Sequence, residues 1–443
     1  MSLSEIKRYD REYVVHSWSV QSALDPIVIV RTQGVYMWDE NGKRYLDMTS
    51  QVMNQNIGHQ HPKVVKAIQR QADKVCYVAP GVAYETRSLL GKALAEVTPG
   101  DLKRFFFTLG GADANENAVK IARAYTKKWK IITRYRSYHG ATYGAIALTG
   151  DPRRPPVEPA MPGVVRVFDP YCYRCSFGLT YPACQLRCAE SVEEVIRYET
   201  PDTVAAVLVE SVVGSNGLIV PPDGYMQRLR EICDRNGVLL IADEVMSGFG
   251  RTGKWFAVEN WNVVPDLITM AKGLTSGYVP LGAIAISKRI MEALDEQMLY
   301  AGLTYSAHPL ACGAAIATLQ VYRDDKLMEN TLAMEKVVRE ELEAMKARHP
   351  SVGDVRGIGL FWAIELVKDK KTREPLVKWN AMGPEGAQTR EINKRLLEGG
   401  VYTMVRWNFL FVVPPLCIKA DELKEGLDVI DRVLDYADTL TKA

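Results

Sequence analysis

The chain has 443 residues, of which 47% are hydrophobic and 24% charged, and 55 basic against 53 acidic residues give a formal net charge of +2. This composition is typical of a globular protein with a large core, and it excludes a nucleic-acid-binding tail and a basic membrane-binding surface. No apolar run approaches the roughly 20 residues that cross a bilayer, and the N-terminus is polar, so we expect a cytoplasmic protein without a secretory signal.

The N-terminal region predicts a β-hairpin. Residues 34–46 form two short strand-like stretches that meet at Asn41-Gly42. Asparagine and glycine tolerate positive φ, so we expect these two residues to form a type I′ turn.

From about residue 60 the pattern changes to helices that alternate with short apolar runs. The runs are apolar throughout, which indicates strands buried on both faces of a largely parallel sheet with helices on both sides. One helix is expected over residues 223–236, with Gly237 just after its end. Seven strands are predicted, at residues 104–107, 131–133, 164–168, 204–209, 238–242, 267–271 and 281–286.

Beyond residue 325 the pattern predicts a smaller α+β domain that the N-terminal hairpin completes. Helices are expected over residues 327–349 and 388–398, and short strands around 361–365 and 409–413. The predicted division is therefore an N-terminal segment of the small domain (1–58), a large domain (59–324) and the rest of the small domain (325–443).

Four of the eight cysteines fall in one short segment, residues 172–188, with the spacing C-x2-C, eight residues, C-x3-C. This spacing is typical of a structural zinc or cluster site. No histidine lies nearby, so a packed insertion with free or disulfide-linked thiols is the alternative, and no metal is expected in the main chemistry. The four segment cysteines are Cys172, Cys175, Cys184 and Cys188; the others, Cys76, Cys233, Cys312 and Cys417, are predicted to be small core residues.

A glycine turn, Gly110-Gly111, joins the strand at 104–107 to a helix. The first turn of a helix has unpaired N–H groups that suit a phosphate, and glycine lets the anion approach the backbone. The sequence matches neither the dinucleotide nor the P-loop motif. Alone, this turn is more typical of an ordinary strand-to-helix connection.

Three other side chains follow predicted strands. Tyr138 follows the strand at 131–133, Asp243 the strand at 238–242, and Lys272 the strand at 267–271. Taken singly, Asp243 is a helix cap, Tyr138 a core aromatic and Lys272 a lysine that has reached the surface. Together with the glycine turn they offer an amine for an aldehyde, a carboxylate for a pyridinium and donors for a phosphate, which are the needs of pyridoxal phosphate.

With these residues in view, the chain resembles the class III, or ω-, aminotransferases of the fold-type I pyridoxal-phosphate enzymes. The resemblance is carried, in order, by RSYHGATYGAIALTG, LIADEVMSGFGRTG, PDLITMAKGLTSGYVPLGA and LTYSAHPLACGAA. Within the family it is nearest to the amine:pyruvate and the taurine or β-alanine:pyruvate enzymes. The expected fold is α/β: a large domain with a mostly parallel seven-stranded sheet between helices, and a smaller α+β domain formed by both termini.

The resemblance implies the catalytic roles and most of the cofactor site. Lys272 is similar to the lysine that binds the cofactor aldehyde and then moves the substrate proton, and Asp243 to the partner of the pyridine nitrogen. The positions expected around the cofactor are Gly111 and Ala112 at the phosphate, Tyr138 and Val245 on the two ring faces, and His139 and Glu210 nearby.

Thr304 resembles the residue that reaches the phosphate of a neighbouring subunit. Because Gly110-Gly111-Ala112 has no hydroxyl group, phosphate binding is expected to depend on backbone amides and on Thr304. This implies a homodimer with shared active sites, with pairing of dimers into tetramers left open.

The expected substrates are an amine donor and a keto-acid acceptor. Arg406 is the candidate for the acceptor carboxylate, with a surface arginine as the alternative; relatives that clamp this arginine have a second glutamate where this chain has Ser215. The remaining expected pocket residues are uncharged and favour neutral amines: Trp18, Val52, Met53, Tyr138 and Leu303.

The resemblance therefore implies ping-pong transfer of an amino group from an ω-amino acid or amine to pyruvate or a similar keto acid. An aminomutase or epimerase on the same scaffold is one alternative. A catalytically silent binding protein is another.

Overall fold

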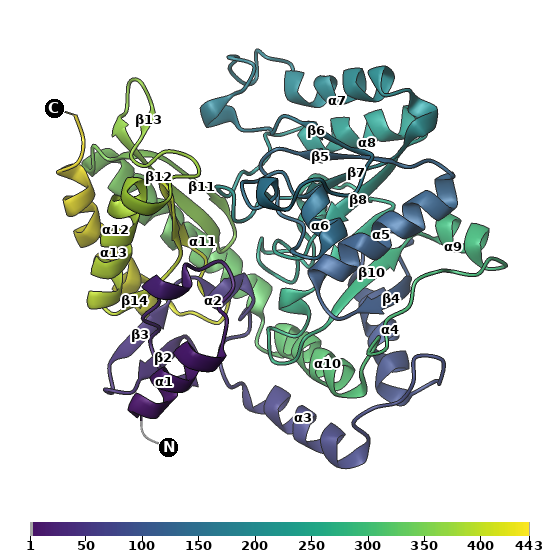
Figure 1. The fold of residues 1–443 in the computed structure, drawn as a ribbon, viewed down its shortest axis with the longest axis horizontal. Helices are drawn as coiled ribbons and strands as arrows, with labels where there is room; N and C mark the ends of the chain where they lie inside the picture. Colours follow the sequence, from purple (N-terminus) through teal and green to yellow (C-terminus); the bar gives the residue numbers. More distant parts are fainter. Residues whose placement is uncertain (1–2, 443) are drawn as a thin grey trace.

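The structure, a computed structural model, describes residues 3–442. Figure 1 shows a large sheet with helices around it and, beside it, a smaller part that holds both the first helix, α1 (Leu3–Tyr13), and the last, α13 (Ala420–Asp438). In this described range no helix is both long and apolar enough to cross a membrane.

All seven strands predicted for the large sheet are present, in the order β4-β10-β9-β8-β7-β5-β6. Strand β10 runs antiparallel to both of its neighbours, and the other pairs are parallel. The expectation of a mostly parallel α/β sheet is confirmed. The strands are β4 (Arg104–Thr108), β5 (Lys130–Arg134), β6 (Val164–Val167), β7 (Val204–Glu210), β8 (Leu239–Asp243), β9 (Leu267–Met270) and β10 (Gly282–Ile286).

Helices cover both faces of this sheet, which explains the continuous apolar runs. Neighbouring residues of β8, Leu240 and Ile241, belong to two separate hydrophobic clusters. Leu240 shares its cluster with α8 (Tyr225–Arg235), whereas Ile241 shares the other with α5 (Gly111–Thr126). Because each face is buried, strand residues of either orientation must be apolar.

Parallel strands end at the same edge of the sheet, and this edge gathers the candidate residues. Glu210, the last residue of β7, pairs in register with Asp243, the last of β8, and Asp243 pairs with Thr269 of β9. Strand β10 is antiparallel to both β4 and β9, so β4 runs in the same direction as β9. The end of β4 therefore also reaches this edge, and α5 begins there.

The smaller part joins the two ends of the chain, as predicted. It contains two sheets. The first has the order β1-β2-β3-β14, in which β14 (Val401–Tyr402) pairs parallel with β3 (Arg44–Asp47). The first sheet also contains β1 (Ile29–Gln33) and β2 (Tyr36–Asp39); the second contains β11 (Val352–Ile358), β12 (Phe361–Asp369), β13 (Glu374–Pro375), β15 (Val405–Arg406) and β16 (Phe409–Val412).

The predicted helices at 327–349 and 388–398 are α11 (Leu327–Arg348) and α12 (Ala387–Glu398). The predicted domain boundaries fall before α3 (Pro62–Lys74) and between α10 (Pro309–Asp324) and α11; as boundaries they stay predictions. The remaining α-helices are α2 (Ser50–Met53), α4 (Glu85–Val97), α6 (Tyr143–Leu148), α7 (Arg187–Tyr198) and α9 (Lys288–Leu294). The short 3-10 helices are η1 (Gln21–Ala23), η2 (Pro155–Val157), η3 (Cys172–Arg174), η4 (Pro201–Thr203), η5 (Ala257–Trp261), η6 (Lys272–Leu274) and η7 (Gly383–Gly386).

The hairpin prediction is confirmed, but its turn type is wrong. In the loop between β2 and β3, the described residues with positive φ include Gly42, at +79°, and not Asn41. The Asp39 carboxylate accepts hydrogen bonds from the backbone amides of Asn41 and Lys43, both at 2.9 Å. This side chain stabilises a longer loop, residues 40–43, in which Asn41 needs no left-handed conformation.

The cysteine predictions have mixed outcomes. Cys233 and Cys312 are buried, as expected, and Cys417 is half-buried, but Cys76 is exposed. All eight cysteines are free, and within residues 3–442 no three of the four thiols in the 172–188 segment bring their sulfur atoms within 4.8 Å of one another. The segment therefore contains no disulfide, and a metal site in it stays a prediction.

Candidate active site

A cavity of about 440 Å³ lies at the strand-end edge of the large sheet. It gathers residues that the sequence spreads from position 111 to position 272. Eight of the nine residues predicted to bind a cofactor line it: Gly111, Ala112, Tyr138, His139, Glu210, Asp243, Val245 and Lys272.

Lys272 follows β9 by two residues and has a positive φ of +38°, a backbone conformation that non-glycine residues rarely adopt. Its half-buried side chain lines the cavity. Burial lowers the pKa of Lys272 to about 8, although the charges of Asp243 and Glu210 raise it. A substantial fraction of this amine is therefore neutral near physiological pH, which makes it a nucleophile and a proton acceptor.

Asp243 lies in the same cavity, buried and held by three donors. Its Oδ2 accepts hydrogen bonds from Asn115 Nδ2 and His139 Nδ1, both at 2.8 Å, and its Oδ1 accepts from the amide of Val245 at 3.0 Å. These donors fix the orientation of the carboxylate. Such an oriented acid can hold a proton on a heterocyclic nitrogen.

Glu210 holds the backbone near Tyr138. Its two carboxylate oxygens accept hydrogen bonds from the amides of Tyr138 at 3.0 Å and Gly214 at 2.9 Å. Burial raises the pKa of Glu210 to about 7; the nearby charge of His139 lowers it and that of Asp243 raises it further.

The N-terminus of α5 supplies donors for an anion. Within the described chain, the amides of Gly111 and Ala112 donate to no protein acceptor. Gly111 packs so closely on Val245 that an added Cβ would lie 2.8 Å from its Cγ1. A helix N-terminus with free amides beside a cavity is suited to a phosphate group.

A cluster of charged and aromatic residues borders Tyr138. The Arg153 guanidinium carbon lies 3.5 Å from the centroid of the Tyr138 ring, and the Trp18 ring meets Tyr138 edge-on at 6.2 Å. The buried carboxylate of Asp151 pairs with Arg153 and, at 3.3 Å, with Arg406. Arg406 is thus no surface residue: it reaches from β15 to the large domain.

The remaining predicted residues lie elsewhere in this chain. Between residues 3 and 442, the wall of the cavity does not include six of the predicted residues: Trp18, Val52, Met53, Leu303, Thr304 and Arg406. Val52 and Thr304 are exposed, Leu303 is partly exposed, and Met53 is buried in the main hydrophobic cluster. The backbone carbonyl of Thr304 accepts a hydrogen bond from the Tyr77 hydroxyl at 2.8 Å, and this bond fixes the position of the Thr304 backbone.

Sequence reasoning missed Asn115, Asp151 and Arg153. Asn115 links Asp243 to Thr269, whose hydroxyl donates to Asn115 Oδ1 at 2.7 Å. The feature that could have identified Asn115 is its position on α5, one turn after Gly111 and on the side that faces the sheet. Asp151 and Arg153 follow α6 in a loop and carry no local pattern that distinguishes them from solvated charges.

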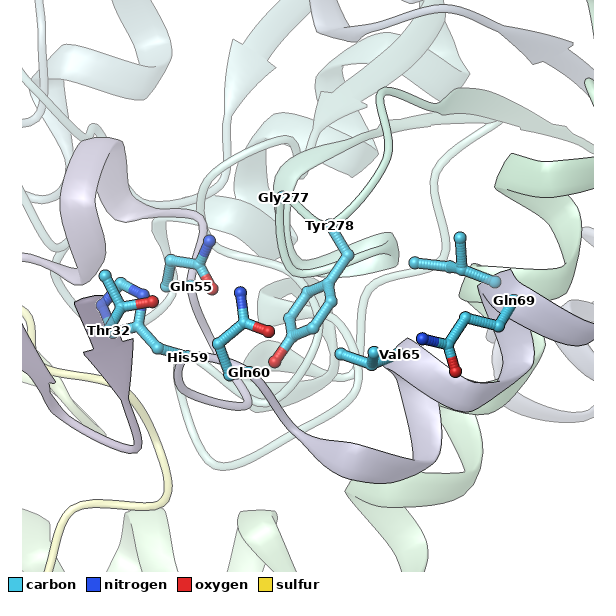
Figure 2. Close-up of a pocket in the computed structure, with 9 residues that line it drawn as sticks. Thr32, Gln55, His59, Gln60, Val65, Gln69, Gly277 and Tyr278 are labelled. Carbon is cyan, nitrogen blue, oxygen red and sulfur yellow. The ribbon is translucent and has the colours of Figure 1, made fainter. Parts of the chain in front are cut away.

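A second cavity, of about 330 Å³, meets the first at Gly277. Figure 2 shows its polar lining, with Thr32 on β1, Gln69 on α3 and the Tyr278 ring between them. Its histidine, His59, pairs with the buried Asp47 at 3.0 Å. The residues of this lining include no lysine and no carboxylate, so the candidate chemistry belongs to the first cavity.

Pyridoxal phosphate has an aldehyde, a ring nitrogen and a phosphate, and the first cavity offers a partner for each. Fold and site together therefore define a pyridoxal-phosphate-dependent enzyme. More narrowly, the chain belongs to the class-III aminotransferases, whose family model matches residues 18–434.

Individual relatives agree with this assignment. A taurine:2-oxoglutarate aminotransferase from Bifidobacterium kashiwanohense, solved with pyridoxal phosphate and glutamate, is 42% identical, covers 99% of both chains and has a TM-score of 0.95. A taurine–pyruvate aminotransferase from Bilophila wadsworthia is 35% identical over 87% of each chain. A leucine/methionine racemase from Thermococcus litoralis is 35% identical over 97% of this chain and 94% of its own.

Proposed function

We propose that this enzyme transfers an amino group from an ω-amino acid or amine to pyruvate or a similar 2-oxo acid. The donor leaves as a carbonyl compound, and the oxo acid becomes an amino acid, in two half-reactions that share one site. The observation that carries the proposal is that Lys272, with its lowered pKa, and the oriented Asp243 share one cavity. The relatives named for taurine, pyruvate and 2-oxoglutarate support the substrate class.

When bound, pyridoxal phosphate supplies an electron sink for the substrate carbon. Nζ of Lys272 would take the proton from the donor carbon and pass it to the bound cofactor, and in the second half-reaction it would move a proton back from the cofactor to the acceptor carbon. Asp243 keeps the ring nitrogen protonated, with His139 and Asn115 holding its carboxylate in place.

Other cavity residues would hold the cofactor. Tyr138 and Val245 would pack against its ring, while Glu210 fixes the backbone of Tyr138. The amides of Gly111 and Ala112 would bind the phosphate.

We also propose a homodimer in which Thr304 completes the partner's phosphate site. Thr304 is exposed and outside its own chain's cavity, which fits a role across an interface. A forced monomer is then expected to retain the cofactor less well. Tetramers and a cytoplasmic location stay predictions.

Racemisation of an amino acid is the second candidate, because one relative is described as a leucine/methionine racemase. A racemase inverts its substrate without an acceptor. The two reactions therefore differ in their need for an oxo acid.

The test is a panel of ω-amino acids, amines and single-enantiomer α-amino acids, each with and without pyruvate or 2-oxoglutarate. We expect stoichiometric formation of the new amino acid only when an oxo acid is present, and complete loss of activity and of the visible absorption of the bound aldehyde in Lys272→Ala. Inversion of an α-amino acid without any oxo acid, and without transfer, would favour racemisation.

A further inference from the structure

The loop between β6 and α7 holds four of the eight cysteines and has little core of its own. Among residues 171–189 all but two are at least partly exposed. Its backbone hydrogen bonds close local turns, such as the one from the amide of Gly178 to the carbonyl of Cys175 at 3.0 Å. Another runs from the amide of Cys184 to the carbonyl of Thr180 at 2.9 Å. An irregular loop of this length, with no disulfide and so few buried side chains, needs another source of rigidity.

The four cysteines stand at the two ends of this loop. Cys172 and Cys175 lie in and just after η3, and Cys184 and Cys188 lie four positions apart where α7 begins. Burial raises the pKa of Cys172, and the thiols of Cys184 and Cys175 raise it further. Burial also raises the pKa of Cys188 to about 11, with further increases from Cys172 and Cys184. The two ends of the loop are therefore within electrostatic reach of each other, and thiolates that repel one another are stabilised together by a cation.

A buried arginine beside the loop has donors without partners. Arg134, at the end of β5, is 1% exposed, and its Nη1 donates to the carbonyl of Glu210 at 3.1 Å. In residues 3–442 its Nε and Nη2 make no hydrogen bond. The carboxyl group within reach of its charge, Asp169, forms no ion pair with it, and burial raises the pKa of Asp169 to about 6. Arg134 also opposes the effect of burial on the pKa of Cys188, so it is within reach of that thiol. A buried guanidinium needs an anion nearby, and a zinc ion with four thiolates is a dianion.

The start of the loop is also a contact between the two parts of the molecule. Tyr171 and Arg174 both bond to the carboxylate of Glu365 in β12. Arg174 donates to the carbonyl of Arg373 at 2.6 Å, and Arg373 donates to the carbonyl of Tyr173 at 2.6 Å. A group that fixes the loop therefore also fixes this contact.

We propose that Cys172, Cys175, Cys184 and Cys188 bind one structural zinc ion, which fastens the loop and its contact with β12. Binding exchanges protons for the metal: Zn²⁺ and four thiols give a tetrathiolate centre and four protons. Zinc takes four thiolates in tetrahedral geometry and has no redox chemistry, which suits an enzyme whose proposed reaction needs no electron carrier. The inference does not depend on the proposed function.

The four sulfur atoms must move together to reach the metal. No three of them lie within 4.8 Å of one another in the described chain, whereas Zn–S bonds of about 2.3 Å set the sulfurs roughly 3.8 Å apart. Cys172 is exposed and the other three thiols are half-buried, so their side chains can rotate without crossing a packed core. The metal-bound loop is therefore expected to be more closed than the metal-free one.

The first test is the zinc content of the untagged holoenzyme, purified without chelators and measured by elemental mass spectrometry. We expect about one zinc per chain in the wild type and less than about 0.1 in the double variant Cys184→Ser/Cys188→Ser. Cys76→Ser is the matched control, because Cys76 is exposed and lies outside the loop, and it should keep about one zinc per chain.

Two measurements on the wild type guard against a variant that fails to fold. Cobalt(II) exchanged for zinc should give the absorption bands of a tetrahedral thiolate site. Chymotrypsin cleaves after aromatic residues, and Tyr181 in the loop is exposed. Removal of the metal should speed cleavage there at least about tenfold, because the loop opens, and added zinc should reverse the effect.

A wild type with less than about 0.1 zinc per chain, and without thiolate bands in cobalt, would overturn the inference. Fewer than eight free thiols in denaturant would also overturn it, because the cysteines would then form disulfides. Iron and sulfide in place of zinc would overturn it as well. If the zinc-loaded enzyme transferred no amino group, the proposed function would fail and the zinc site would stand.

Discussion

At the scale of single residues, the site concentrates buried charge that the fold alone does not need. Asp243 is buried with three hydrogen-bond donors, whereas Lys272 is half-buried in the cavity wall and makes no hydrogen bond in the described chain. A buried, unpaired ammonium is destabilising. This cost is expected where a side chain is kept ready for a cofactor.

The first prediction concerns the stability of the cofactor-free enzyme. The pKa of Lys272 is about 8 in the folded chain and 10.5 when unperturbed. Between these values the unfolded chain binds more protons, so the free energy of unfolding should rise with pH from about 8 to 10.5. At pH 7, Lys272→Met should stabilise the apoenzyme by about 3 kcal/mol.

Urea denaturation of both apoproteins at several pH values measures this. The pH-dependent rise above pH 8 should be absent from Lys272→Met, and Lys288→Met, at an exposed lysine, is the control. A variant no more stable than the wild type at pH 7 would contradict the prediction.

Residue-level prediction from sequence succeeded where a side chain directly follows a strand. Lys272, Asp243 and Tyr138 could be identified because parallel strands end at one edge, which brings them together. Asn115 and Arg153 could not be identified: 128 residues separate Asn115 from Asp243, and the loop of Arg153 has no local pattern that distinguishes it from solvated charge. Their roles as partners in the site stay proposals.

At the scale of elements, the start of α5 combines a strand end, a helix N-terminus and a close contact. The first helical residue, Gly111, faces Val245 with no space for a side chain. Sequence identified this turn from its glycines, but the contact with Val245 depends on how β8 and α5 pack.

The second prediction compares two glycines in helices. Gly111→Ala should push Val245 into the cavity and raise the cofactor dissociation constant about tenfold, because overpacking costs about 1–3 kcal/mol. Gly91→Ala, in α4 with open space around its Cα, should leave cofactor binding unchanged and stabilise the protein by roughly 0.5–1 kcal/mol.

Titration of each apoprotein with pyridoxal phosphate, followed by absorbance, gives both constants. If Gly111→Ala bound the cofactor as tightly as the wild type, the close packing at this turn would have no role in cofactor binding.

At the scale of the whole molecule, one buried arginine connects the two parts. Arg251, which follows β8 in the large part, donates to the carbonyls of Leu360 at 3.0 Å and Pro414 at 2.6 Å, and to Asn56 Oδ1 at 2.8 Å. In residues 3–442 it has no ion pair with a carboxylate. Burial lowers the pKa of Arg251 to about 10.

The third prediction is that Arg251→Met lowers the free energy of unfolding by about 3 kcal/mol or more, because it leaves several buried acceptors without a donor. Arg104→Met is the control: its exposed pair with Asp295 should contribute less than about 1 kcal/mol. Urea midpoints of the holoenzymes measure both, and similar small shifts would show that Arg251 is not needed to hold the two parts together.

Local sequence determined the large sheet, because strands buried on both faces must be apolar along their whole length, and this pattern is readable without a structure. The order of the motifs likewise determined the family. Only the tertiary structure decided that β3 pairs with β14 and that Asp151 meets Arg406, 255 residues away. Such pairings depend on how separate elements pack in three dimensions, and a charged residue in a loop has the same local signature whether it faces solvent or a substrate.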